Sequence, residues 1–218
     1  PLITDAKSAP KSVVPETNVT VATGISHPTP TMTKPITAAA AMILMDRGQL
    51  DLHDKVSWYL DGFKDQKVWT EDGLVPVERE VSIKNLLDMT SGLCYPDDWF
   101  PAGKEMSKLY TKLDEEYKAG NPSDTLTYAN LIGQQPLAFQ PGEKWLYGTS
   151  ADILGAVIEV VSKKKFGDFL REEIFEPLGM VDTDFYVPEE KLCRFAENYQ
   201  PEGDKLIPCE WQHLGLTY

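Results

Sequence analysis

Apolar residues recur at helical spacing along much of the 218-residue chain, which predicts a mainly α fold. The pattern is strongest between about 150 and 163, where the repeating apolar residues are Ile153, Leu154, Val157, Ile158 and Val161. Asp152 stands early in this stretch and Lys163 stands late, an arrangement that the helix dipole favours. The segment therefore predicts the best-defined helix of the chain.

Weaker periodic segments predict several more helices and one hairpin. The predicted helices cover about 35–48, 82–92, 106–117, 126–135 and 166–175, and Ser82 is the expected N-cap of the second of these. Pro35 is tolerated only near a helix start, so residues 31–34 are expected at the N-terminal end of the first helix. Residues 68–70 and 75–77 flank Glu71-Asp72-Gly73 and predict a short β-hairpin.

The periodic pattern divides the chain into three parts. Residues 1–30, rich in proline, serine and threonine, predict an irregular arm with at most a short strand at 18–22. Residues 31–187 form the predicted helical region. Residues 188–218 are expected to be irregular again.

Composition limits the classes of function. Hydrophobic residues make up 42% and charged residues 25% of the chain, which is typical of a globular protein. The net charge of −13 makes nucleic acid an unfavourable partner. No stretch predicts a membrane span, and no signal peptide is visible in a chain that begins with Pro1. Cytoplasmic and processed secreted locations both stay open, as does the oligomeric state.

Metal and cofactor chemistry have no sequence support. Cys94, Cys193 and Cys209 lack the spacing of metal ligands, and the histidines are isolated along the chain. Phosphate-binding glycine loops and a Gly-x-Ser-x-Gly nucleophile motif are also missing from the sequence. We therefore predict no cofactor and no metal site.

The most informative residues for chemistry are Thr31-Met32-Thr33-Lys34. A hydroxyl and a lysine three residues apart at a helix start lie on the same face of the first turn. This arrangement allows a lysine amine to take the proton of a nucleophilic oxygen.

The tetrapeptide resembles the Ser-x-x-Lys motif of serine β-lactamases, penicillin-binding proteins and related esterases. Four further stretches are similar to the same family in the same order, and they cover residues 43–52, 81–93, 139–149 and 175–183. The resemblance extends over roughly residues 32–187. It implies an α+β fold of the β-lactamase/transpeptidase type, of which this chain holds mainly the helical lobe and little of the antiparallel sheet.

The resemblance also implies a site and a reaction. Thr31 takes the nucleophile position, Lys34 is the expected base, and Tyr147 is the expected proton partner. Such a site attacks the carbonyl of a small-molecule ester, amide or β-lactam and forms an acyl-enzyme that water releases. Free lysine and tyrosine titrate near 10, so the mechanism requires a site that makes one of them a base at neutral pH.

The sequence departs from the family pattern at three places. Threonine stands at position 31, where its extra methyl group restricts χ1 and crowds the attack. Tyr147-Gly148-Thr149 replaces the frequent Tyr-x-Asn, which favours an ester substrate slightly. The family's third motif, on a strand that supplies part of the oxyanion hole, has only the faint counterpart His213-Leu214-Gly215. Whether residues 1–30 or another chain supply the sheet stays open.

Each site residue also has a structural interpretation. Thr31 suits a helix N-cap, Lys34 suits a solvated helix face, and Tyr147 suits packing on the turn at 141–142. The alternative hypothesis is therefore a non-catalytic scaffold or binding module derived from the same family.

Overall fold

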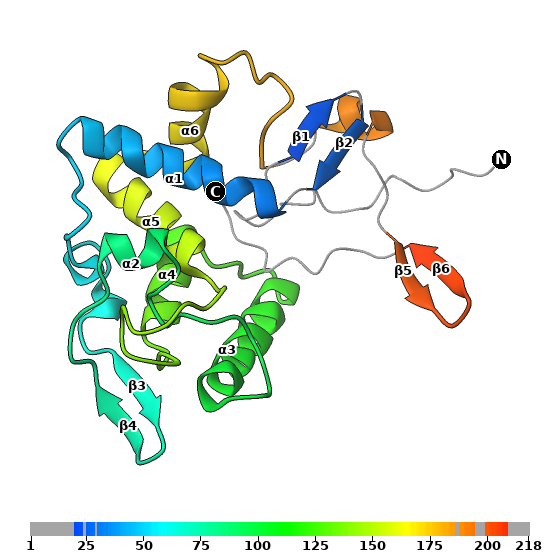
Figure 1. Ribbon diagram of the computed structural model, residues 1–218. Coiled ribbons are helices and arrows are strands. Elements are labelled where there is room, and N and C mark those ends of the chain that lie inside the picture. The colour runs from blue at the N-terminus through cyan, green and yellow to red at the C-terminus, as the bar shows by residue number, and fades with distance from the viewer. Residues whose placement is uncertain (1–19, 24, 29, 186–187, 195–198, 209–218) are drawn as a thin grey trace.

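The computed structural model of the chain describes residues 20–23, 25–28, 30–185, 188–194 and 199–208. Helices dominate these residues (Figure 1). The α-helices are α1 (Pro30–Asp46), α2 (Ile83–Leu87), α3 (Pro101–Lys118), α4 (Thr125–Gly133), α5 (Ser150–Ser162) and α6 (Phe166–Leu170). One π-helical turn, η3 (Arg171–Phe175), continues α6, and the 3₁₀ turns are η1 (Val56–Trp58), η2 (Asp61–Phe63) and η4 (Glu189–Arg194).

The strands of the described residues form three separate antiparallel hairpins. Their members are β1 (Thr20–Thr23) with β2 (Ile25–Pro28), β3 (Lys67–Thr70) with β4 (Gly73–Pro76), and β5 (Tyr199–Glu202) with β6 (Lys205–Pro208). The β3–β4 hairpin was predicted from the sequence and is confirmed, with Val68 opposite Val75. None of these described strands joins a larger sheet, in agreement with the prediction of a mainly α chain.

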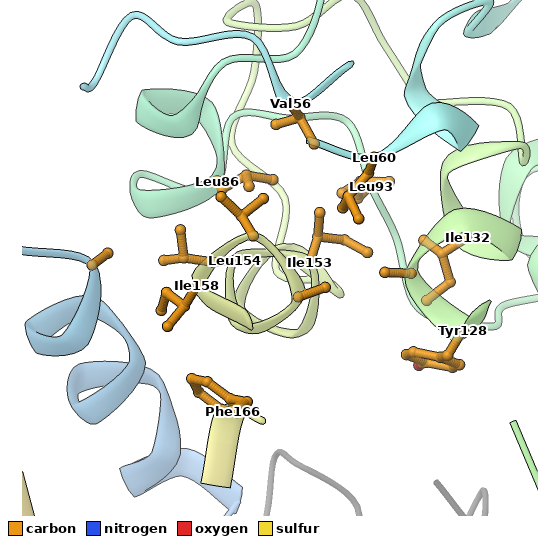
Figure 2. Close-up of a cluster of buried hydrophobic side chains, with 14 of the residues drawn as sticks. Val56, Leu60, Leu86, Leu93, Tyr128, Ile132, Ile153, Leu154, Ile158 and Phe166 are labelled. Atoms are coloured by element: carbon orange, nitrogen blue, oxygen red, sulfur yellow. The ribbon is translucent and has the colours of Figure 1, made fainter. Parts of the chain in front are cut away.

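Helix α5 occupies the centre of the fold. It packs against α1, α2, α4 and α6, and residues 150–159 of the helix are all buried. Figure 2 shows Ile153, Leu154 and Ile158 of α5 surrounded by apolar side chains that come from the neighbouring elements. A helix that is buried on every side needs mostly apolar or small residues all round, which this sequence supplies except at Asp152 and Glu159. The N-terminal end of α5 is consequently fixed within the core.

Local sequence explains where two of the helices begin. Ser82 caps α2 through a capping box, in which its hydroxyl accepts from the Asn85 backbone while the Asn85 side chain accepts from the Ser82 backbone. This cap was predicted and is confirmed. Asp124 caps α4 by accepting a hydrogen bond of 2.7 Å from the Thr127 backbone. Both caps satisfy N–H groups that a helix start leaves without a partner.

Helix α1 begins at Pro30, earlier than its apolar pattern indicates, so that Pro35 lies in its second turn. Proline has no N–H to donate to the carbonyl four residues back, so it disturbs the helical bonding of the first turns only. Nearby, the Thr37 hydroxyl donates to the Thr33 carbonyl at 3.1 Å. Residues 31–34 thus lie at the N-terminal end of the helix, as predicted.

Two segments differ from the expectation of irregular chain. Within 188–218, residues 189–194 form η4 and residues 199–208 form the β5–β6 hairpin, whose turn contains Gly203 at a φ of 60°. Glycine adopts this backbone conformation without steric cost, and it allows a tight turn that apolar periodicity does not reveal. Within 1–30, two strands form rather than one, and the β-branched residues of 20–25 favour them. Residues 1–19 and 209–218 lie outside the described residues.

We predict that truncating a core side chain of α5 destabilises the fold strongly. Leu154 is only 2% exposed at the centre of the core, so Leu154→Ala is expected to lower the free energy of unfolding by about 2–5 kcal/mol. Leu178→Ala is the matched control, because Leu178 is 70% exposed and should cost less than about 0.5 kcal/mol. Equal destabilisation by the two substitutions in urea titrations would contradict the central position of α5.

Candidate active site

The first turns of α1 carry two of the three predicted site residues. Thr31 and Lys34 belong to the N-terminal part of this helix, and residues three apart share a helix face. The side chain of Thr31 lies outside what the structure describes, whereas that of Lys34 is described and half-buried. The backbone alone therefore places position 31 on the same side of the helix as Lys34.

Lys34 meets the third predicted residue, Tyr147. Its Nζ lies 4.6 Å from the centroid of the Tyr147 ring, within the range of a cation–π interaction. Tyr147 precedes α5 and is 44% exposed, so one side of this pair faces solvent. The structure thus brings together an amine and a phenol that are far apart in sequence.

The loop before α5 is held in place by the segment that follows α2. The backbone N–H of Gly142 donates to the Thr90 carbonyl at 2.8 Å, and that of Leu146 donates to the Met89 carbonyl at 3.0 Å. A Cβ on Gly148 would lie 2.2 Å from the Leu93 carbonyl oxygen, so only glycine allows this approach. Tyr147 is therefore positioned by rigid backbone contacts on both sides.

Ser91 and Thr149 are both buried, and the hydroxyl of Ser91 is held by hydrogen bonds. Ser91 is fully enclosed, and its hydroxyl shares a 2.8 Å hydrogen bond with the Ser150 hydroxyl and accepts from the Leu93 backbone. These contacts give Ser91 a structural role in the turn that follows α2. Thr149 is 0% exposed, so the side chain at the family's Tyr-x-Asn asparagine position points into the protein. It is not presented to a ligand.

Two half-buried tyrosines that were not predicted from the sequence as site residues lie near Tyr147 and Asp152. The ring of Tyr95 is tilted against that of Tyr147, with centroids 5.8 Å apart. Tyr110 of α3 shares a 2.6 Å hydrogen bond with the Tyr128 hydroxyl. Burial, and secondarily the negative charge of Asp152, raises the pKa of both Tyr95 and Tyr110. Their hydroxyl groups therefore stay protonated at neutral pH.

The environment of Asp152 differs from the one predicted from the sequence. The residue was predicted to complement the helix dipole, but its side chain is only 7% exposed, in the first turn of α5. Burial raises the pKa of this carboxyl to about 7, against the opposing effect of the Lys34 charge. The available signal was an acid in the first turn of a mostly apolar helix. A buried, titratable carboxyl thus lies in the first turn of the helix that follows Tyr147.

The described part of the chain gives no sign of other site types. No group of three metal-ligating side chains occurs within it. None of its helices combines the length and the apolar character needed to cross a bilayer. The faint counterpart of the third motif at 213–215 falls outside the described residues.

The raised pKa of Asp152 predicts how the stability of the folded protein depends on pH. The folded-state pKa of about 7 exceeds the ordinary value of 3.8, so the folded protein binds the proton more tightly than the unfolded chain. Stability from this group is complete below pH 4 and is lost as the pH rises through 7. Asp152→Asn cannot ionise, so its stability relative to wild type should increase from about pH 4 to 8, by on the order of 4 kcal/mol at most.

Chemical denaturation at several pH values measures this difference. Asp168→Asn is the control, because Asp168 pairs with Arg171 at the exposed surface of α6 and should give a nearly constant difference. A difference between Asp152→Asn and wild type that does not change with pH would show that Asp152 is not a buried, protonatable group.

Comparisons with known proteins extend over most of the chain. The β-lactamase family model matches residues 31–212. An uncharacterised protein of Mycobacterium tuberculosis is 33% identical over 181 residues, which cover 80% of this chain and 43% of that protein. Esterase EstB of Burkholderia gladioli is 33% identical over 176 residues, covering 78% of this chain and 41% of EstB.

Comparison with solved structures shows the same relationship at the level of the fold. EstCE1, described as a hydrolase with promiscuous acyltransferase activity, matches with a TM-score of 0.63 and 25% identity. The match covers 81% of this chain and 43% of EstCE1, so the chain spans less than half the length of each of these relatives. The predicted fold class, a mainly helical part of the β-lactamase/transpeptidase fold, is confirmed.

Proposed function

This chain belongs to the β-lactamase family, and from that membership we propose that it transfers acyl groups through an ester formed at Thr31. The observation that carries the proposal is the position of the Lys34 amine, 4.6 Å from the centroid of the Tyr147 ring. The nucleophile position precedes Lys34 by one helical turn. Such a reaction needs a nucleophilic hydroxyl together with a base and a proton partner, and an amine and a phenol can fill the last two roles.

The reaction proceeds in two proton-balanced stages. The neutral amine of Lys34 takes the proton of the Thr31 hydroxyl while the oxygen bonds to the substrate carbonyl carbon. The bond to the leaving group then breaks, and the leaving oxygen takes a proton that Tyr147 relays from the Lys34 ammonium. Water then attacks the acyl-threonine with the same proton transfers. The carboxylic acid is released and the Thr31 hydroxyl is restored.

An ester is the substrate class that the observations favour. Thr149 is buried where an exposed asparagine amide would contact the amide of a peptide or β-lactam. Among the relatives, EstB is named an esterase and EstCE1 a hydrolase with acyltransferase activity. We therefore place small carboxylic esters ahead of amides and β-lactams.

The clearest prediction concerns covalent labelling by a fluorophosphonate probe, a mimic of the acylated tetrahedral state. The chain is expected to gain the mass of the phosphonyl group at Thr31, and Lys34→Ala should slow labelling by about a hundredfold or more because the base is lost. Lys112→Ala is the control, because Lys112 is an exposed lysine on α3. Intact-mass and peptide spectra measure both quantities.

Thr31 variants complete this experiment. Thr31→Ala should abolish labelling, and Thr31→Ser should accelerate it because the crowding methyl group is removed. No mass gain in any of these proteins is the result expected of a non-catalytic scaffold, and it would overturn the proposal. Equal rates for wild type and Lys34→Ala would remove Lys34 from the mechanism.

A second prediction separates the hydroxyl of Tyr147 from its ring. Tyr147→Phe keeps an aromatic face over Lys34 but removes the proton-relaying hydroxyl, so labelling should slow by about a hundredfold while the melting temperature is unchanged. Tyr117→Phe on α3 serves as the matched control. If Tyr147→Phe reacts at the wild-type rate, the hydroxyl takes no part, and Tyr147 has only a packing role.

A further inference from the structure

The Tyr147 ring has a second described neighbour besides Lys34. The ring of Tyr95 lies against it, with centroids 5.8 Å apart and an angle of 51° between the ring planes. Tilted pairs at this separation are among the arrangements that aromatic rings favour. Tyr147 is 44% exposed, whereas Tyr95 is half-buried, so the less exposed ring borders the more exposed one. The proposed reaction assigns no role to Tyr95.

Tyr95 comes from a segment that is held firmly against the loop before α5. A Cβ on Gly148 would lie 2.9 Å from the Cα of Cys94, the residue before Tyr95, so the two backbones are in direct contact. Cys94 is itself only 1% exposed. The 2.8 Å hydrogen bond between the Ser91 and Ser150 hydroxyls joins the same two parts of the chain. A ring carried by such a backbone offers a fixed surface to its neighbour.

An exposed ring needs such a surface if its hydroxyl is to have one position. The Tyr147 side chain can rotate about two torsions, and solvent on its exposed side does not select one rotamer. The proposed reaction needs the phenol close to the Lys34 amine, because proton transfer depends on heavy-atom distances of about 2.6–3.2 Å. The ring of Tyr95 fills part of the space that Tyr147 would enter on rotating.

We propose that Tyr95 is a positioning residue for Tyr147: its ring holds the Tyr147 ring beneath the Lys34 amine, and so keeps the phenol in place for proton transfer. The hydroxyl of Tyr95 takes no part. Burial raises the pKa of this hydroxyl, which therefore stays neutral at physiological pH. The contribution of Tyr95 to the reaction rests on the proposed function, whereas its contribution to the geometry does not.

The first test measures this geometry and needs no substrate. An aromatic face shifts the NMR signals of nearby protons upfield, so the ε-methylene of Lys34 reports whether the Tyr147 ring lies beneath it. Tyr147→Leu gives the value without the ring. In Tyr95→Leu the upfield shift is expected to fall by about half or more, while Tyr95→Phe, which keeps a ring, should give the wild-type shift. An unchanged shift in Tyr95→Leu would overturn the proposal.

Two further proteins keep this test decisive. Tyr95→Gln is the second variant should Tyr95→Leu not fold, because a half-buried position lets the flexible amide reach solvent. Tyr59→Leu is the control for the loss of a half-buried tyrosine, since the Tyr59 hydroxyl donates to Asp54 at 2.6 Å. It should lose stability and leave the Lys34 shift unchanged. A Lys34 shift that follows stability in all of these proteins would assign Tyr95 to folding alone.

Labelling of Thr31 by the fluorophosphonate probe measures the catalytic consequence. In Tyr95→Leu the maximal labelling rate should fall about three- to tenfold, which is the size of the population change that an aromatic pair can produce. The probe concentration for half-maximal rate should change less than about twofold, and Tyr95→Phe should retain the wild-type rate. A loss confined to the half-maximal concentration would show that Tyr95 contacts the probe and does not position Tyr147.

The two measurements separate this inference from the proposed function. If the Lys34 shift falls in Tyr95→Leu but Thr31 is never labelled, the proposed reaction fails and the positioning of Tyr147 stands. If Thr31 is labelled and the Lys34 shift does not change, the role of Tyr95 is lost and the reaction stands.

Discussion

The packing of α1 on the central helix α5 is the constraint on which the site depends. It brings the first turns of α1 against the first turn of α5 and the loop before it. Lys34 comes from one helix, while Tyr147 and Asp152 come from the start of the other. Because α5 is buried on every side, neither helix can shift without opening the core. The site therefore inherits its geometry from apolar packing.

The same packing accounts for the unusual electrostatics. A helix start offers partial positive charge and N–H groups that favour a carboxylate, but burial opposes the charge on Asp152 more strongly. The result is a buried acid that can change its charge near neutral pH. In a more exposed position Asp152 would stay ionised at neutral pH.

The sequence predicted more of the fold than of the site. Helical periodicity, the Ser82 cap and the β3–β4 turn are local signals, so these elements followed from the residues themselves. The pairing of Lys34 with Tyr147 was reached only through family resemblance, since no local pattern joins residues so far apart. The burial of Asp152 was missed, because the position of an acid in the core depends on tertiary packing that a single helix does not encode.

A crystal structure of the chain after reaction with the fluorophosphonate probe would test how these groups converge. We expect density that joins the Thr31 Oγ1 to phosphorus, with the Lys34 amine within hydrogen-bonding distance of that oxygen. Asp152 should remain buried in the first turn of α5. A probe bound elsewhere, or a Lys34 side chain that points into solvent away from Tyr147, would contradict this expectation.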